Sequence, residues 1–378
     1  MKDFIYWLRL KLISYLYFFS PIKRDKIVFI NFNGKGYGCN PKYIAEEIIR
    51  QNLDYDMVWL VNDMNVDMPE QIRKATFRGK DGLYEIATAK VIVTNVKNDL
   101  FLVKKRGQYV IQTWHGSYNI KLVEKEAVDR LSASYIRESK KNSKQTDVFI
   151  SNSKILSKSY RDAFWCDCEI MECGIPRSDV LFREDKDVIN KKVREVLGVS
   201  LEDKLVLYAP TFRDDGSIDA YNVPSEKILE ALGDEWKILL RLHPNVDVND
   251  VGYVYTDRII NASVYPDMQD IILAADVLIT DYSDSIFEFS LLRKPSYIYA
   301  TDIEAFEAMR GLNPDFYKMP FKVCTTDEEL IAELCKYTPE VGRAAADKFM
   351  EMIGCTDTGN ASKCVVQRIR EVIEGNRD

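Results

Sequence analysis

Short hydrophobic runs alternate with amphipathic segments along most of the chain. In the first half, runs that predict strands cover Ile27–Phe32, Met57–Val61, Val91–Thr94, Tyr109–Thr113, Val148–Ser151 and Ile170–Glu172. In the second half they cover Leu205–Ala209, Trp236–Leu242, Arg258–Ile260, Val277–Thr280 and Ser296–Tyr299. The intervening segments have helical length, so the pattern predicts βαβ units and parallel sheets.

Helices are predicted between these strands, and a charged, loop-like stretch at 183–187 divides the two halves. The first helix is predicted over Pro41–Gln51, with Asn40 as its cap and Pro41 in the first helical position. Others are predicted over Pro224–Leu232, Met268–Ala274, Ser285–Leu292 and Ala361–Glu374. We expect an α/β protein with domains at 26–185 and 186–378 and a cleft at the carboxyl ends of the strands. The last helix can pack back on the first domain.

The sequence predicts a separate helix over residues 1–25. Phe4–Phe19 is apolar and aromatic but is interrupted by Arg9 and Lys11 and is shorter than a spanning helix. It has no small-residue cleavage site of a signal peptide. Residues 1–30 carry six Lys or Arg against two Asp. This pattern favours an amphipathic helix on an anionic membrane surface over the alternative, an ordinary helix buried on another domain.

Composition narrows the class of protein. A chain of 378 residues that is 46% hydrophobic and 29% charged is folded and has the length of two domains. Its net charge of −7 argues against nucleic acid as a partner, so a phosphate-rich ligand must meet local cations. Several of the 8 cysteines sit inside apolar stretches, which predicts buried thiols of a reducing compartment rather than a disulfide framework. Cys166, Cys168 and Cys173 lack a CxxC pair and a nearby His, so we interpret them as structural and expect no metal site.

A dinucleotide-binding alternative rests on the glycines of the first predicted βα loop. Gly34, Gly36 and Gly38 follow a strand, and Asp63 follows the next one, where a ribose ligand would lie. The G-x-G-x-x-G spacing requires glycine at position 39, which is Cys39. The alternative is therefore disfavoured.

The two histidines are the first candidates for chemistry. His115 lies in the run QTWHGS at 112–117, and His243 lies in RLHPN at 241–245. Both follow predicted strands and precede Gly or Pro, which places them at the mouth of a sheet. Since histidine suits proton transfer near neutral pH, we interpret both as functional rather than as packed core residues.

Three further segments have the composition of phosphate-binding loops. The run YAPTFR at 208–213 ends a strand with a hydroxyl and a guanidinium. The run TDYSDS at 280–285 leads into a helix, whose free N–H groups and hydroxyls form an anion site. The turn GIPRSD at 174–179 presents Arg177, whose planar donors suit phosphate. The P-loop pattern is absent from the sequence.

Taken in order, these runs resemble a known family. QTWHG, GIPRSD, YAPTFR, RLHPN, TDYS and the run DIE at 302–304 occur in the same order in the CDP-glycerol glycerophosphotransferase family, which comprises teichoic acid primases and polymerases. The loop at 34–42 also resembles the first loop of that family. The resemblance extends from about residue 26 to the C-terminal helix.

The resemblance implies a GT-B-like fold, with two Rossmann-type domains facing across a cleft. It implies transfer of a polyol phosphate, such as glycerol phosphate, from a CDP-activated donor to an acceptor hydroxyl, with release of CMP. His115 is the implied base and His243 a second catalytic residue at the donor. The implied donor contacts are Thr211, Arg213, Arg241, Thr280, Ser283, Ser285 and Glu288. Acceptor or phosphate contacts are assigned to Gly116, Ser117 and Arg177.

One position departs from the family pattern, and several properties stay open. Asp284 stands where a second serine is common, so we expect it to point away from the donor or Ser285 to supply the hydroxyl. Because CMP is a good leaving group, we expect no cofactor and no metal. The expected acceptor is a lipid-linked saccharide or polyol-phosphate chain at the cytoplasmic face of the membrane. A ribitol-phosphate transferase, a nucleotide-sugar glycosyltransferase and a non-catalytic binding module remain alternatives, and the sequence leaves the oligomeric state and the wall or capsule pathway open.

Overall fold

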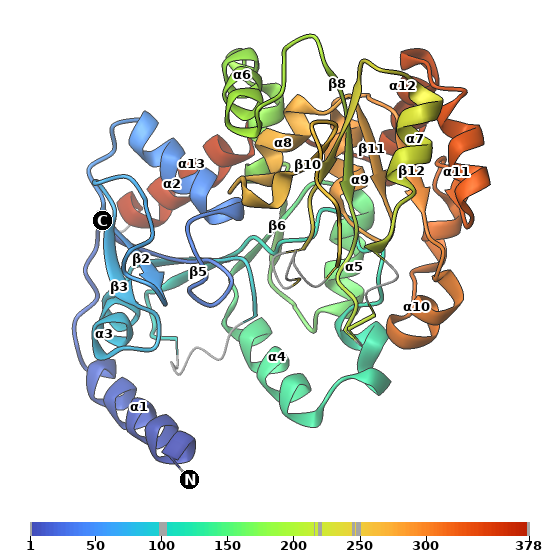
Figure 1. Cartoon of the computed structure of the whole chain (residues 1–378). Coiled ribbons are helices and arrows are strands. Elements are labelled where there is room, and N and C mark those ends of the chain that lie inside the picture. Colours follow the sequence, from blue (N-terminus) through green and yellow to red (C-terminus); the bar gives the residue numbers. More distant parts are fainter. Residues whose placement is uncertain are drawn as a thin grey trace. The chain divides into compact units, whose positions relative to one another are not determined.

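The computed structural model describes residues 2–97, 104–214, 216–217, 221–243, 246 and 251–375, with side chains from residue 8 onward (Figure 1). The chain divides into two compact units. The first comprises Met1–Gly116, Val123–Asp179 and Thr356–Asp378. The second comprises Ser117–Leu122 and Val180–Cys355. The main divide follows Asp179, near the predicted boundary at residue 185, and the transfer of Ser117–Leu122 to the second unit was not predicted.

The first unit contains a seven-stranded parallel sheet in the order β3-β2-β1-β4-β5-β6-β7. Its strands are β1 (Lys26–Ile30), β2 (Asp56–Val61), β3 (Arg73–Thr76), β4 (Val91–Thr94), β5 (Tyr109–Gln112), β6 (Val148–Ser151) and β7 (Glu169–Glu172). The strand order reverses between β1 and β4. Ligands of open parallel sheets bind at such a reversal, outside the carboxyl ends of the strands.

Helices cover both faces of this sheet. They are α1 (Lys2–Phe18), α2 (Cys39–Arg50), α3 (Lys80–Thr88), α4 (Ala133–Gln145), α5 (Lys154–Ala163) and α13 (Ala361–Glu374), with 3-10 turns η1 (Glu124–Arg130) and η2 (Pro176–Phe182). On one face, Ile44 of α2 and Ile369 of α13 share a buried cluster with Trp59. On the other face, Ile86 of α3 packs with Val28. Figure 1 shows α13 beside α2, so the end of the chain completes the first unit.

The start of α2 differs from the sequence prediction. The helix begins at Cys39 and its N-cap is Gly38, not Asn40. Asn40 is buried inside the first turn, and its Nδ2 donates to the carbonyl of Trp114 at 2.9 Å. The Asn40 side chain, which was predicted to cap the helix, therefore binds the loop after β5.

Helix α1 packs against the first unit on one side and exposes apolar side chains on the other, so its contact with a membrane stays a prediction. Leu10 and Ser14 are buried, and the Tyr17 ring lies edge-on to Tyr84 of α3, with centroids 5.4 Å apart. The opposite side exposes Leu8, Leu12, Tyr15, Leu16 and Phe19. Lys26, counted among the basic residues of this segment, is fully buried against Glu85 and Thr88, so it is not available to a membrane. No helix within the described residues is both long and apolar enough to cross a bilayer.

The second unit contains a six-stranded parallel sheet in the order β10-β9-β8-β11-β12-β13. Its strands are β8 (Lys204–Ala209), β9 (Trp236–Leu240), β10 (Ile259–Asn261), β11 (Val277–Thr280), β12 (Ser296–Tyr299) and β13 (Val323–Cys324). The order reverses between β8 and β11. The predicted α/β class with two parallel sheets is confirmed, whereas the predicted cleft between the halves stays a prediction.

Helices lie around this second sheet in the part of the unit that the structure describes. They are α6 (Lys186–Leu197), α7 (Ser225–Leu232), α8 (Met268–Ala274), α9 (Ser285–Leu291), α10 (Ile303–Arg310), α11 (Asp327–Leu334) and α12 (Pro339–Ile353), with 3-10 turns that include η4 (Ala262–Val264) and η5 (Pro314–Lys318). Ile228 of α7 and Leu330 of α11 pack in one buried cluster with Tyr208 of β8.

The expectation of free thiols is wrong for one pair of cysteines. Cys166 and Cys168 form a disulfide with their Cα atoms 5.5 Å apart. Trp165 has a positive φ of 51°, which turns the chain where the pair begins. Among the free thiols, Cys335 and Cys364 are exposed. Cys324 is the buried thiol that the sequence pattern led us to expect.

Candidate functional site

His115 lies in the first unit, directly beyond the carboxyl end of β5. Its Nδ1 is 2.8 Å from the carbonyl oxygen of Asn95. A carbonyl only accepts hydrogen bonds, so Nδ1 carries a proton, and in the neutral imidazole the lone pair is then on Nε2. The imidazole is therefore held in the tautomer that can accept a proton through Nε2.

Asn95, which follows β4, is itself held from the loop after β1. It is fully buried, its Nδ2 donates to Oδ1 of Asn31 at 2.8 Å, and its Oδ1 accepts the N–H of Phe32 at 2.9 Å. Nδ2 of Asn31 in turn donates to the carbonyl of Lys35 at 2.8 Å. The carbonyl that orients His115 is thus fixed at the reversal point between β1 and β4.

Strained backbone gathers around this network. Phe32, Asn33, Cys39 and Trp114 have φ of 41°, 56°, 54° and 53°. Non-glycine residues rarely adopt positive φ, and such strain clusters at functional sites because packing must enforce it. Gly34 has a φ of 88°, and a Cβ there would lie 2.8 Å from Cβ of Phe77. The glycines of this loop therefore permit a close turn next to His115.

Arg177 binds the loop after β5, which carries His115. It is largely buried, and its Nη1 donates to the carbonyl of His115 at 2.7 Å. Its N–H donates to Oδ1 of Asn40 at 3.1 Å. Asp179, in the same turn, accepts the N–H of Ser362 at 2.7 Å, which ties the turn to α13. The residue predicted to contact phosphate therefore positions His115 through its backbone.

In the second unit, Arg213 lies in a buried ion-pair network. The Arg213 and Asp281 side chains are each 2% exposed, and Nη2 lies 2.8 Å from Oδ2 of Asp281. Nε donates to Oδ2 of Asp302 at 2.7 Å, and Nη1 donates to the carbonyl of Thr211 at 2.6 Å. Burial lowers the pKa of Arg213, but the contacts with the two carboxylates have the larger effect, so the pKa is raised. The guanidinium predicted to bind the donor thus joins β8, β11 and β12 within the protein.

Two of the predicted hydroxyl ligands are used internally as well. Oγ1 of Thr280 donates to the carbonyl of Ala209 at 2.6 Å. Oγ of Ser285 donates to Oγ of Ser283 at 3.1 Å. Asp284 is the N-cap of α9 but makes no side-chain cap hydrogen bond. Ser283 is only half-buried, so it is the more accessible of the two serine hydroxyls at this turn.

Glu288 and Ser117 hold each other within the second unit. Oγ of Ser117 donates to Oε1 of Glu288 at 3.0 Å, and Nε2 of Gln269 donates to Oε2 at 3.4 Å. Both partners of the first contact are buried. The pair fixes the segment that begins at Ser117 in the second unit. Gly116, the residue before it, still belongs to the first unit.

Arg241 and His243 follow β9 in the second unit. The guanidinium of Arg241 donates to carbonyls of the loop after β10, including Ala262 at 3.0 Å and Ser263 at 3.1 Å, and burial lowers its pKa. His243 is exposed, and its ring lies 5.5 Å from that of Phe212. Pro244 and Asn245 of this motif lie outside the described residues. Arg241 therefore supports the loop, whereas His243 faces solvent at the end of a strand.

Several functional candidates were not found from the sequence. Asn31 and Asn95 orient His115, but a backbone carbonyl has no sequence signature. Asp281 and Asp302 lie inside recognised motifs, yet only the fold reveals that they share Arg213. No group of three or more His, Cys, Asp or Glu side chains suited to a metal ion occurs in the part of the chain that the structure describes.

Two parallel sheets, each with polar loops at its reversal point, define a two-unit, doubly wound α/β protein. The chain belongs to the CDP-glycerol:poly(glycerophosphate) glycerophosphotransferase family, whose model matches residues 12–371. The resemblance predicted from the ordered motifs is confirmed.

Two relatives and one solved structure illustrate the similarity. The teichoic acid poly(glycerol phosphate) polymerase of Bacillus spizizenii is 29% identical over 368 residues, covering 92% of this chain and 93% of the relative. The protein of the same name from Staphylococcus epidermidis is 30% identical over 373 residues, covering 93% of this chain, which spans about half (51%) of that relative. A variant of the wall teichoic acid polymerase TagF soaked with CDPG is 27% identical with a TM-score of 0.84, covering 100% of this chain and 97% of that chain.

Proposed function

We propose that this protein transfers glycerol phosphate from CDP-glycerol to a hydroxyl of a membrane-linked teichoic-acid-type or capsule acceptor, releasing CMP. Family membership supports the reaction class, and the TagF structure soaked with CDPG supports the donor. The observation that carries the proposal is the hydrogen bond from Nδ1 of His115 to the carbonyl of Asn95, because it leaves Nε2 as the ring nitrogen that can act as the base.

The chemistry follows from this tautomer. The acceptor oxygen attacks the phosphorus that bears glycerol, and His115 Nε2 takes the hydroxyl proton as the new P–O bond forms. The bond from that phosphorus to the bridging oxygen breaks, and CMP leaves with that oxygen. In phosphoryl transfer the barrier is charge on these oxygens, so positioned donors and cations lower it. The loops after β8 and β11, with Ser283 and His243, supply the donor side in this proposal.

The donor is the first point to test. We expect CMP release with CDP-glycerol and a lipid-linked acceptor, and incorporation of glycerol phosphate into the lipid fraction. CDP-ribitol and a UDP-sugar serve as comparison donors, because ribitol-phosphate polymerases are also relatives, one being 28% identical over 362 residues. Faster turnover with CDP-ribitol would show that the donor is CDP-ribitol and not CDP-glycerol. Transfer only from the UDP-sugar would show that the protein is a glycosyltransferase. We propose that no cofactor or metal is needed, which CMP release in excess chelator tests.

A second part of the proposal is peripheral attachment to the cytoplasmic face of an anionic membrane. Exposed apolar side chains of α1 form a stripe at positions 8, 12, 15 and 16, and Phe19, just beyond the helix, is exposed as well. Such a stripe is typical of a helix that lies in the headgroup layer. In the same unit, α4 carries four cations against one carboxylate, Glu138.

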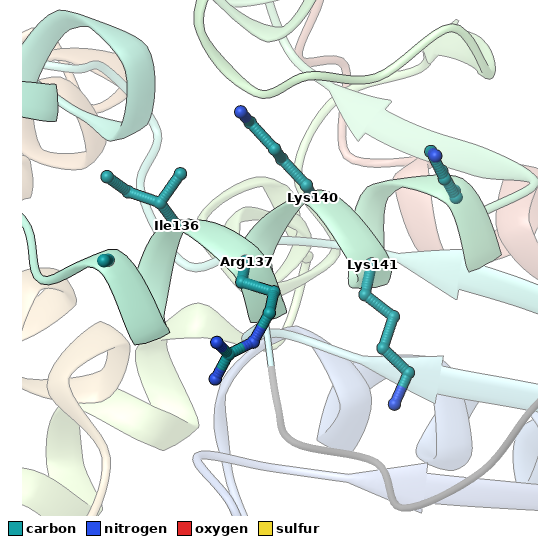
Figure 2. A pocket seen from close by; sticks show the side chains of 6 residues that line it. Ile136, Arg137, Lys140 and Lys141 are labelled. Carbon is teal, nitrogen blue, oxygen red and sulfur yellow. The ribbon is translucent and has the colours of Figure 1, made fainter.

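The cations of α4 border a hollow in the surface. A cavity of about 610 Å³ is lined by Ala133, Ile136, Arg137, Lys140, Lys141 and Lys144. Figure 2 shows Arg137 and Lys141 projecting from one side of α4 and Lys140 from another. Such a concentration of positive charge in a chain of −7 favours an anionic partner, and it supports attraction to acidic headgroups.

The α1 stripe can be tested without deleting the helix. Leu12 and Leu16 are 59% and 71% exposed, so replacing both with Gln removes apolar area without opening a cavity. We expect binding to anionic vesicles to fall by about tenfold or more, since each buried leucine contributes roughly 1.5–3 kcal/mol. Co-sedimentation with vesicles measures this. Leu201→Gln, at a leucine 57% exposed in the second unit, is the matched control. Equal binding by the double variant and the control would exclude this stripe as the attachment surface.

A further inference from the structure

Lys121 lies on the short segment Ser117–Leu122, which belongs to the second unit although it stands in the first half of the chain. Lys121 forms an antiparallel bridge with Leu312, and the N–H of Asn313 donates to the carbonyl of Ile120 at 2.8 Å. At the other end of the segment, Ser117 is bound to Glu288. Both ends are therefore anchored, and the position of the Lys121 backbone in the second unit is defined.

The ammonium group of Lys121 has no hydrogen bond and no ion pair with any residue that the structure describes. Burial lowers its pKa, while the charges of Asp284 and Asp281 act in the opposite direction. Lys121 is half-buried, and even partial removal of a cation from water without a contacting partner costs free energy. Nothing inside the described protein offsets this cost through direct contact.

The neighbouring cations differ from Lys121 in this respect. Arg213 and Arg310 both depress the pKa of Lys121, so they are its electrostatic neighbours. Arg213 is bound to Asp281 and Asp302, and Arg310 Nη1 lies 2.7 Å from Oδ2 of Asp214. The two arginines are neutralised by contact, whereas Lys121 is left to meet an anion from outside.

A second polar group beside Asp281 also lacks a partner. Oγ1 of Thr211 is buried, with the residue 9% exposed, and no described residue bonds to it. The N–H of the same residue donates to Oδ1 of Asp281 at 2.8 Å, which places Thr211 next to the carboxylate that also acts on Lys121. A buried hydroxyl without a partner is costly and indicates a ligand or ordered solvent at that place.

We propose that Lys121 binds a phosphate group of the diphosphate of the nucleotide donor, with Thr211 Oγ1 as a second donor. This inference rests on the proposed function and assigns its diphosphate ligand. Both groups lie in the second unit, and Thr211 follows β8 at the reversal point between β8 and β11, where ligands of such sheets bind. An ammonium group is a compact charge with three donors, and hydrogen bonds to phosphate are strengthened by charge.

Arg213 is used inside the protein and is not available to a diphosphate. Its guanidinium is bound by two carboxylates, so it cannot neutralise a diphosphate without giving up those contacts. Asp284 adds a further negative charge near the same place. A diphosphate bound there requires a cation that has no carboxylate in contact, and Lys121 meets that requirement.

The test compares ligands with and without phosphate. In Lys121→Gln, the affinity for CDP, measured by titration calorimetry, should fall by about 10- to 100-fold, the effect expected for a charged hydrogen bond. The affinity for cytidine should stay unchanged, and Lys121→Arg should restore much of the affinity for CDP. The salt dependence of CDP binding should also weaken in Lys121→Gln. Lys336→Gln is the control, since Lys336 is exposed and bound to Glu333 at 2.8 Å.

Wild-type protein supplies a second measurement that does not depend on the folding of a variant. An amine-acetylating reagent should modify Lys121, and CDP but not cytidine should protect it, as read by mass spectrometry. Unchanged CDP affinity in Lys121→Gln, equal loss for CDP and cytidine, or absence of protection by CDP would each overturn the assignment. If wild-type protein bound neither CDP nor CDP-glycerol, the proposed function itself would fail.

Discussion

Replacing His115 with alanine should lower kcat by about 10²- to 10⁴-fold, the contribution expected of a general base. The affinity for CDP-glycerol should change little, because a base acts on the acceptor hydroxyl and not on the bound donor. The structure gives the physical reason, since the Asn95 carbonyl holds the Nδ1 proton and so directs Nε2 to accept the proton. CMP release measures kcat, and calorimetry with CDP-glycerol measures the affinity.

His243→Ala is the informative comparison, because the chain has only 2 histidines. His243 lies in the second unit at the end of β9, so as a donor ligand it should affect donor affinity as well as turnover. Parallel loss of Tm and activity in both variants would indicate packing roles instead. Full activity of His115→Ala would refute the proposed base.

Orientation of the imidazole can be separated from its presence. Asn95→Ala removes the two side-chain hydrogen bonds that hold the Asn95 backbone but leaves His115 in place. We expect a lower kcat with a shifted pH profile and nearly unchanged donor affinity. A lower Tm with an unchanged pH profile would contradict this positioning role and indicate a role in folding alone.

The sequence pattern predicted the buried strands because their apolar runs are continuous. Val91–Thr94, Val148–Ser151 and Val277–Thr280 were predicted with the bounds that the structure has. The edge strands β3 and β13 were missed for a physical reason. β3 reads RKAT and is exposed at both ends, and β13 is two residues long. An edge strand buries little, so it needs no apolar run.

The site was predicted at the level of loops but not of individual contacts. The loops carrying His115, Thr211 and Ser283 do end strands at or beside the reversal points of the two sheets. The sequence could not reveal that Arg213 is neutralised by Asp281 and Asp302, because those residues are far apart in the chain. It also could not show that Lys121 joins the second unit, since that depends on a backbone bridge to Leu312. Residue type indicates what a side chain can bind, and the fold decides whether it is already bound.

Arg213→Met should destabilise the second unit by about 3–5 kcal/mol, because it leaves Asp281 buried without its cation. For a unit of this size that corresponds to a fall in Tm of roughly 6–20 °C. Calorimetric unfolding measures the change. Arg310→Met is the control, since Arg310 pairs with Asp214 at the surface and should contribute less than about 1 kcal/mol.

A second substitution identifies the cause of this loss. If the cost is the uncompensated carboxylate, then adding Asp281→Asn to Arg213→Met should recover part of the stability, because the buried charge is removed. Arg213→Lys should be intermediate, since the ammonium keeps the charge but cannot span Asp281 and Asp302 as the guanidinium does. Should Arg213→Met unfold like the wild type yet bind CDP at least tenfold more weakly, the guanidinium would be a donor ligand after all. The ion pair would then be a resting contact that the diphosphate displaces, and Lys121 would share the phosphate with Arg213.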